Sequence, residues 1–147
     1  MLNPFLSMKA IDKSFGNVNA LKNAEFELKK GEVHALLGVN GAGKSTLMKV
    51  LSGVYEQDVG EILLEGERIR IRSPKVAKDF GIYCVYQEVD TAIVAELSVA
   101  ENILLDKIVA GSNMFISKKK LNREARNALK QLQVVNISVE IPAFMLS

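Results

Sequence analysis

The chain has 147 residues, of which 48 % are hydrophobic and 24 % are charged, and these proportions are normal for one soluble globular domain. A net charge of +2, from 19 basic and 17 acidic residues, gives no electrostatic basis for binding nucleic acid. The single cysteine, Cys84, excludes an internal disulfide, and no apolar stretch approaches the roughly 18 residues of a membrane span. The N-terminus lacks the basic and apolar regions of a signal peptide. We therefore expect a cytoplasmic protein.

The first third of the chain predicts strands followed by a helix. Residues 7–12 and 25–29 alternate loosely, as two antiparallel strands would. Between them, Phe15-Gly16-Asn17 is typical of a turn that carries an aromatic side chain. Residues 33–37 are apolar throughout and predict a strand buried on both faces, with His34 as a histidine of the core or sheet. A helix is expected from about Lys44 to Ser52.

The next segment predicts a hairpin, a second helix and another buried strand. Residues 61–65 and 68–71 are expected to pair as a short hairpin. Ser73-Pro74 is typical of a helix start, with the serine as N-cap and the proline at the first helical position. Residues 82–86 form a third apolar run, in which Cys84 is expected to be a small buried residue.

The pattern then becomes helical. Ser98-Val99-Ala100-Glu101 is a capping box, which predicts a helix to about Leu105. From Lys118 to Val134 apolar residues recur at helical spacing with charges between them, which predicts a further helix. We therefore divide the chain into a partial α/β core, residues 1–90, and a partial helical subdomain, residues 91–147.

The strongest functional pattern is the segment from Gly38 to Thr46, which reads GVNGAGKST. It fits the phosphate-binding pattern G-x-x-x-x-G-K-[ST], and it lies between an apolar run and a helix-forming run, as such loops do. The alternative is a glycine-rich turn that only caps a helix. The spacing and the context favour the phosphate loop.

In such a loop, glycines allow the backbone N–H groups to surround phosphate oxygens. Lys44 would neutralise the β- and γ-phosphates, and the Ser45 hydroxyl would bind Mg²⁺. The other loop residues expected to bind the nucleotide are Gly38, Asn40, Gly41, Ala42, Gly43 and Thr46. The sequence therefore predicts that the chain binds a nucleoside triphosphate.

A phosphate loop alone does not separate ATPases, GTPases and small-molecule kinases. The sequence lacks the D-x-x-G and N-K-x-D patterns of a GTPase, and small-molecule kinases usually place this loop near the N-terminus. Here an antiparallel segment precedes a loop of the longer form G-x-N-G-A-G-K-S-T. With these features the chain resembles the ATP-binding subunit of an ABC transporter.

Three further segments carry the resemblance. Lys13-Ser14-Phe15-Gly16 is similar to the opening segment of the family, whose aromatic residue, here Phe15, stacks on adenine. Val85-Tyr86-Gln87-Glu88 resembles the Q-loop, which implies that Gln87 meets Mg²⁺ and the γ-phosphate and that Lys44 and Gln87 serve catalysis. Leu97 to Ile103 resembles the start of the helical subdomain. The implied fold is a P-loop NTPase core with an antiparallel β prefix and the start of a helical subdomain.

Within the family, Ser73-Pro74-Lys75 and Gln87-Glu88 are most similar to ATPases of monosaccharide importers of the ribose, galactose and xylose type. The resemblance implies ATP and Mg²⁺ as cofactors and a second nucleotide-binding cassette as a partner. It also implies transmembrane permease subunits, contacted through the Q-loop and the helical subdomain, and a peripheral position on the inner face of the cell membrane. Two features depart from this subfamily: Val39 stands where Glu is common, and residues 90–95 are about two residues longer than usual.

Three features that such a cassette needs for hydrolysis do not occur in the sequence. They are the signature L-S-G-G-Q, an apolar strand that ends in Asp-Glu (the Walker B strand), and a histidine switch. Leu146-Ser147 resembles the first two residues of the signature. We therefore expect an N-terminal fragment of the first cassette that does not hydrolyse ATP by itself. Unpaired strands should make it self-associate or rearrange its sheet.

Two alternatives stay open at this point. One is a stand-alone module that only binds or senses nucleotide. The other is an ABC protein without a transport role, acting in DNA repair or translation, although the absence of a basic patch disfavours it.

Overall fold

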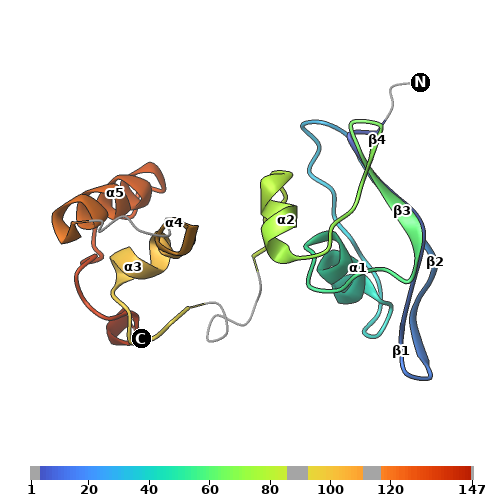
Figure 1. The fold of residues 1–147 in the computed structure, drawn as a ribbon, viewed down its shortest axis with the longest axis horizontal. Helices are drawn as coiled ribbons and strands as arrows, with labels where there is room; N and C mark the ends of the chain where they lie inside the picture. The colour runs from blue at the N-terminus through green and yellow to red at the C-terminus, as the bar shows by residue number, and fades with distance from the viewer. Residues whose placement is uncertain (1–3, 86–92, 111–116, 147) are drawn as a thin grey trace. The chain divides into compact units, whose positions relative to one another are not determined.

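The computed structural model describes residues 4–85, 93–110 and 117–146 (Figure 1). It divides into two compact units, Met1–Val85 and Tyr86–Ser147, and each unit is described by itself. No helix within the described ranges is long and apolar enough to cross a membrane.

The first unit contains an antiparallel sheet of four strands in the order β2-β1-β3-β4 (Figure 1). Its strands are β1 (Leu6–Phe15), β2 (Val18–Leu28), β3 (Val59–Leu64) and β4 (Glu67–Ile69). The two antiparallel strands expected at the N-terminus are confirmed, and so is the hairpin after residue 60. Both N-terminal strands are longer than predicted, because β1 continues to Phe15 and β2 begins at Val18, on either side of the turn.

An irregularity in the middle of β1 determines which of its side chains reach the core. Met8 and Ile11 are both fully buried although they are three positions apart, a spacing that puts side chains on opposite faces of a regular strand. The register shifts at this point on both sides of β1, and Ala10 has a φ of 51°. A β-bulge of this kind inserts an extra residue and so returns the later side chain to the same face.

Two helices complete the core of the first unit. Helix α1 (Lys44–Leu51) buries Leu47 and Val50, and α2 (Pro74–Asp79) buries Ala77. The predicted start of α2 is confirmed, because the Ser73 Oγ accepts a hydrogen bond from the Val76 N–H at 3.3 Å and Pro74 follows the cap. The remaining core side chains come from the strands and from the segment after β4: Leu6, Met8, Ile11, Leu21, Ile62, Ile69 and Ile71.

The buried strands predicted at residues 33–37 and 82–86 do not form within the described residues, and these predictions were wrong. Residues 33–37 and the described part of the second run, residues 82–85, form no ladder, and Val33 and Val85 are 101 % and 97 % exposed. The physical reason is that a strand exists only with a partner, and no described segment pairs with either run. Cys84 is accordingly exposed, contrary to expectation.

His34 was expected in the core or the sheet, and this prediction was also wrong, because the residue is exposed and lies outside any strand. Its Nδ1 lies 3.1 Å from the Glu32 Oε1, and its ring meets the Phe26 ring edge to face at 5.3 Å between centroids. Hydrogen bonds from the Lys29 backbone N–H and from His34 hold the pKa of Glu32 below its usual range. The His34 side chain therefore contacts both β2, through Phe26, and the segment that follows β2, through Glu32.

The second unit is helical, with α3 (Val99–Ile103), α4 (Leu105–Ala110), α5 (Lys118–Gln131) and a short 3₁₀ helix (Ala143–Leu146). The predicted capping box is confirmed: the Glu101 N–H donates to the Ser98 Oγ, and the Ser98 N–H donates to the Glu101 carboxylate at 2.8 Å. The predicted first helix is divided at Leu104, and α5 ends three residues before the expected position. The core of this unit contains Ala100, Leu104, Leu121, Ala125 and Val139.

Candidate nucleotide-binding site

The predicted phosphate loop leads directly into α1, which begins at Lys44 as expected. Gly41 and Gly43 have φ angles of 83° and 82°, in the left-handed region that glycine adopts without strain. Gly43 is the N-cap of α1, and no side chain caps the helix there. The backbone N–H groups of the first turn are therefore presented to an anion without a competing side-chain acceptor.

The loop packs closely on the sheet through Gly43. An ideal Cβ at this position would lie 2.7 Å from the Ala20 carbonyl oxygen and 2.8 Å from the Leu21 Cδ2. Backbone cannot yield at such distances, so only glycine allows this approach. The contact places the loop against the start of β2.

The Lys44 side chain turns back over the loop. Its Nζ donates hydrogen bonds of 2.7 Å to the carbonyl oxygens of both Gly38 and Val39. The ammonium group is thus held by the backbone of the loop, and a bound phosphate chain would contact the same loop. A triphosphate at this position would meet a positive charge that is already placed.

Most of the other loop residues are open to solvent. Asn40, Gly41 and Ala42 are exposed, and Ser45 and Thr46 lie in the first turn of α1, where Ser45 is exposed. No group of three or more His, Cys, Asp or Glu side chains that could hold a metal occurs among the residues that the structure describes. Mg²⁺ does not require such a group, because it commonly takes one protein ligand together with phosphate oxygens and waters.

The second part of the candidate site is the end of the β1–β2 hairpin. Lys13 pairs with Leu21, the residue that contacts the loop at Gly43, so the hairpin end lies beside the phosphate loop. Phe15 stands at this end and is 41 % exposed, and its ring meets the Tyr55 ring edge to face at 4.9 Å between centroids.

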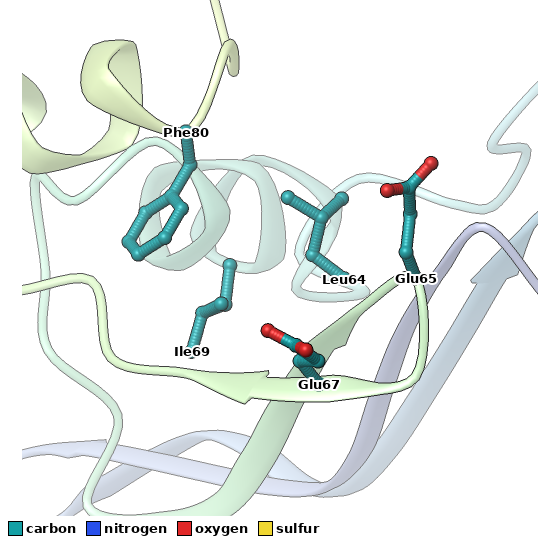
Figure 2. A pocket seen from close by; sticks show the side chains of 5 residues that line it. All are labelled: Leu64, Glu65, Glu67, Ile69 and Phe80. Atoms are coloured by element: carbon teal, nitrogen blue, oxygen red, sulfur yellow. The ribbon is translucent and has the colours of Figure 1, made fainter.

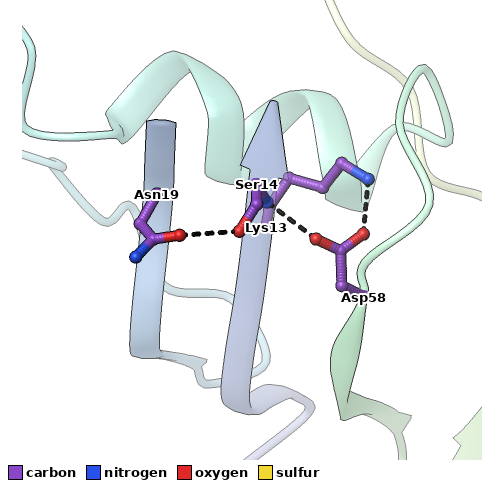
Figure 3. A network of polar contacts seen from close by, with 4 residues as sticks. All are labelled: Lys13, Ser14, Asn19 and Asp58. Atoms are coloured by element: carbon purple, nitrogen blue, oxygen red, sulfur yellow. Dashed lines mark hydrogen bonds and ion pairs between the residues drawn. The ribbon is translucent and has the colours of Figure 1, made fainter. Parts of the chain in front are cut away.

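A polar network fixes the same hairpin end (Figure 3). Both carboxylate oxygens of Asp58 accept hydrogen bonds of 2.7 Å, one from the Lys13 Nζ and the other from the Ser14 N–H. The Ser14 Oγ in turn donates to the Asn19 Oδ1 at 2.9 Å across the hairpin. The bonds from Lys13 and Ser14 hold the pKa of Asp58 below its usual range.

The structure thus brings the loop from Gly38 to Thr46 and Phe15 into one region. Gln87, the other residue assigned to metal and γ-phosphate, lies outside the described residues. Tyr55 and Asp58 were missed by the sequence reasoning, because nothing in the pattern around them connects them with Phe15.

A cavity of about 310 Å³ also occurs in the first unit, between β3, β4 and the end of α2 (Figure 2). None of its lining residues belongs to the phosphate loop; they are Leu64, Glu65, Glu67, Ile69 and Phe80. Its polar groups are two carboxylates, which would repel a phosphate chain. The cavity is therefore not part of the nucleotide site.

The fold and the loop together define an ATP-binding cassette of the P-loop class. A nucleotide-free ATP-binding cassette from an ABC transporter superposes on the chain with a TM-score of 0.77 and 26 % identity, over 99 % of this chain and 60 % of that one. A subunit of an ABC transporter complex from Clostridium perfringens gives a TM-score of 0.70 and 27 % identity, over 99 % of this chain and 57 % of that one.

The family model for ABC transporters matches residues 21–147, and the chain therefore belongs to the ABC transporter family. It is 46 % identical over 131 residues to the ribose import ATP-binding protein RbsA of Caldanaerobacter subterraneus subsp. tengcongensis. It is 40 % identical over 143 residues to the xylose/arabinose import ATP-binding protein XylG of Sulfolobus acidocaldarius. These matches cover 89 % and 95 % of this chain, but 26 % and 56 % of the two relatives. The family assignment made from the sequence is confirmed.

Proposed function

We propose that this chain is the ATP-binding part of an ATPase that drives the import of a monosaccharide. The observation that carries the proposal is the loop GVNGAGKST at the start of α1, with the Lys44 ammonium held inside it by two carbonyl oxygens. The relatives are named as import proteins for ribose and for xylose or arabinose, and these names support a monosaccharide as the substrate.

In this proposal each part of the site has a separate task. Phe15 stacks on adenine, and the loop N–H groups hold the α- and β-phosphates. Lys44 exchanges its carbonyl partners for the β- and γ-phosphates, whose negative charges attract the ammonium more strongly than neutral carbonyl groups do. The Ser45 hydroxyl and Gln87 hold Mg²⁺, which when bound neutralises charge on the terminal phosphates.

Hydrolysis requires more than these residues. No Asp-Glu strand, signature or histidine switch occurs within the 147 residues, and in this proposal it is the carboxylate of such a strand that polarises the attacking water. We propose that the chain binds Mg-ATP but turns it over only in an assembly that supplies those groups. In that assembly a second cassette would supply the signature, and permease subunits would hold both cassettes on the cytoplasmic face of the membrane.

The direct test is a calorimetric titration of the chain with Mg-ATP. We expect saturable binding with one site, and we expect Lys44→Ala to abolish it. The matched control is Lys75→Ala, which removes the same charge from an exposed position on α2 and should leave binding unchanged. Equal affinity in the wild-type chain and in Lys44→Ala would refute the proposed site.

A further inference from the structure

We propose that Tyr55 and Asp58, on the segment between α1 and β3, are positioning residues that hold Phe15 where it meets the base of the nucleotide. The inference rests on the proposed function, because it assumes a nucleotide on the phosphate loop. Neither residue would touch the phosphates. Both would act through Phe15.

Asp58 fixes the backbone immediately before Phe15. One carboxylate oxygen binds the Lys13 ammonium and the other binds the Ser14 N–H, so a single side chain holds two consecutive residues at the end of β1 (Figure 3). The Asp58 N–H also donates to the Asp12 carbonyl oxygen at 2.9 Å. The Lys13 side chain is 16 % exposed but the Asp58 side chain is 42 % exposed, so water screens the ion pair and the hydrogen-bond geometry, rather than the charge, is what orders the segment. Asp58 therefore acts as a clamp between the segment before β3 and the end of β1.

Tyr55 supports the ring itself. Its own ring packs against the hydrophobic core of the first unit, and its N–H donates to the Lys49 carbonyl oxygen at 3.1 Å. The Phe15 ring rests on this anchored ring with an angle of 68° between their planes, a favoured edge-to-face arrangement. The Lys13 ammonium lies 5.6 Å from the Phe15 centroid, which adds a cation–π contact.

These contacts leave part of the Phe15 ring open while restricting its motion. A side chain that is 41 % exposed at a hairpin end would ordinarily lose rotamer freedom when it binds a ligand. Here the Asp58 clamp and the Tyr55 ring order the Phe15 side chain before a nucleotide binds. The same hairpin is packed on the phosphate loop through Ala20, so Phe15 and the loop keep a fixed separation. Loss of the clamp should weaken the hold on the base and leave the hold on the phosphates intact.

The experiment separates base from phosphate. We would titrate the chain with Mg-ATP and, in parallel, with Mg-tripolyphosphate, which has phosphates but no base. For Asp58→Ala and Tyr55→Ala we expect the Kd of Mg-ATP to rise by about two- to tenfold, the range for one side chain that must be ordered on binding. The Kd of Mg-tripolyphosphate should not change.

Two variants serve as controls on the same segment. Tyr55→Phe keeps the supporting ring and should bind Mg-ATP as the wild type does. Glu56→Gln breaks the neighbouring ion pair with Arg70, 2.8 Å long, without touching the hairpin, and it should also leave both affinities unchanged. Asp58→Asn, a milder change, should weaken Mg-ATP less than Asp58→Ala because one acceptor oxygen remains.

Phe15→Ala distinguishes the failure of this inference from the failure of the proposed function. If Phe15→Ala weakens Mg-ATP selectively but the Asp58 and Tyr55 variants do not, the positioning role is wrong and the base site stands. If the Tyr55 variant weakens both ligands equally, its role is only structural, and the inference is again overturned. If Phe15→Ala leaves Mg-ATP affinity unchanged, the proposed base site itself is wrong.

Discussion

Ser7 lies in β1 with 3 % of its surface exposed, and its hydroxyl has no hydrogen-bond partner among the described residues. A buried hydroxyl without a partner retains its desolvation penalty. We therefore expect Ser7→Ala to raise the free energy of unfolding by about 1 kcal/mol, measured as a higher urea midpoint. Ser73→Ala is the matched control, and its effect should have the opposite sign. It removes the N-cap of α2 and should lower the free energy of unfolding by about 1 kcal/mol. A lower midpoint for Ser7→Ala would contradict this account.

At the same scale, the candidate site divides into a predictable part and a part that only the fold reveals. The loop from Gly38 to Thr46 could be predicted because its residues are consecutive, and their spacing alone places the lysine at the start of a helix. The clamp on Phe15 could not be predicted. Lys13 and Asp58 are 45 positions apart in sequence and meet only because β1 pairs with β3.

At the scale of the element, the capping box at the start of α3 gives a pH-dependent contribution to stability. Hydrogen bonds from the Ser98 hydroxyl and N–H hold the pKa of Glu101 below its usual range. A lowered pKa in the folded state contributes stability that is present above the pKa of the unfolded chain. That stability is lost as the pH falls through the lowered pKa. We expect Glu101→Gln to be less stable than the wild type at pH 7, and the difference should vanish in acid.

The measurement is the free energy of unfolding of both chains from pH 7 down to the acid limit of the transition. Glu96→Gln removes an exposed carboxylate just before the cap and controls for the change in net charge. A difference between wild type and Glu101→Gln that stayed constant with pH would show that the charge of Glu101 does not matter to the cap.

Elements differed in how far local sequence determined them. The helix starts at Ser73 and Ser98 were predicted correctly, because a cap acts on backbone groups within three residues of itself. The runs 33–37 and 82–86 were predicted as strands from apolar composition, which indicates where a strand would be buried but supplies no partner for it. The bulge in β1 also escaped prediction, because the close approach of Gly60 to the Ala10 carbonyl is a contact between strands.

At the scale of the whole molecule, the first unit presents apolar side chains that its own sheet does not cover. Val33 and Leu37 are 101 % and 87 % exposed, and Tyr83 and Val85 are 75 % and 97 % exposed. Side chains of this kind are usually buried, and contiguous apolar segments on a surface favour association. We therefore expect the chain to self-associate, with a weight-average mass that rises with concentration in sedimentation velocity.

Substitutions within the first run test whether that segment drives the association. The double variant Val33→Lys/Leu37→Lys adds charge where the backbone is already exposed, so it should lower the association constant without unfolding the sheet. Val135→Lys, at a position 77 % exposed in the second unit, adds charge elsewhere and should leave association largely unchanged. A monodisperse monomer at high concentration, with one cooperative unfolding transition, would refute the prediction. If both variants reduced association equally, the cause would be net charge, because repulsion between like-charged chains acts wherever the lysines are placed.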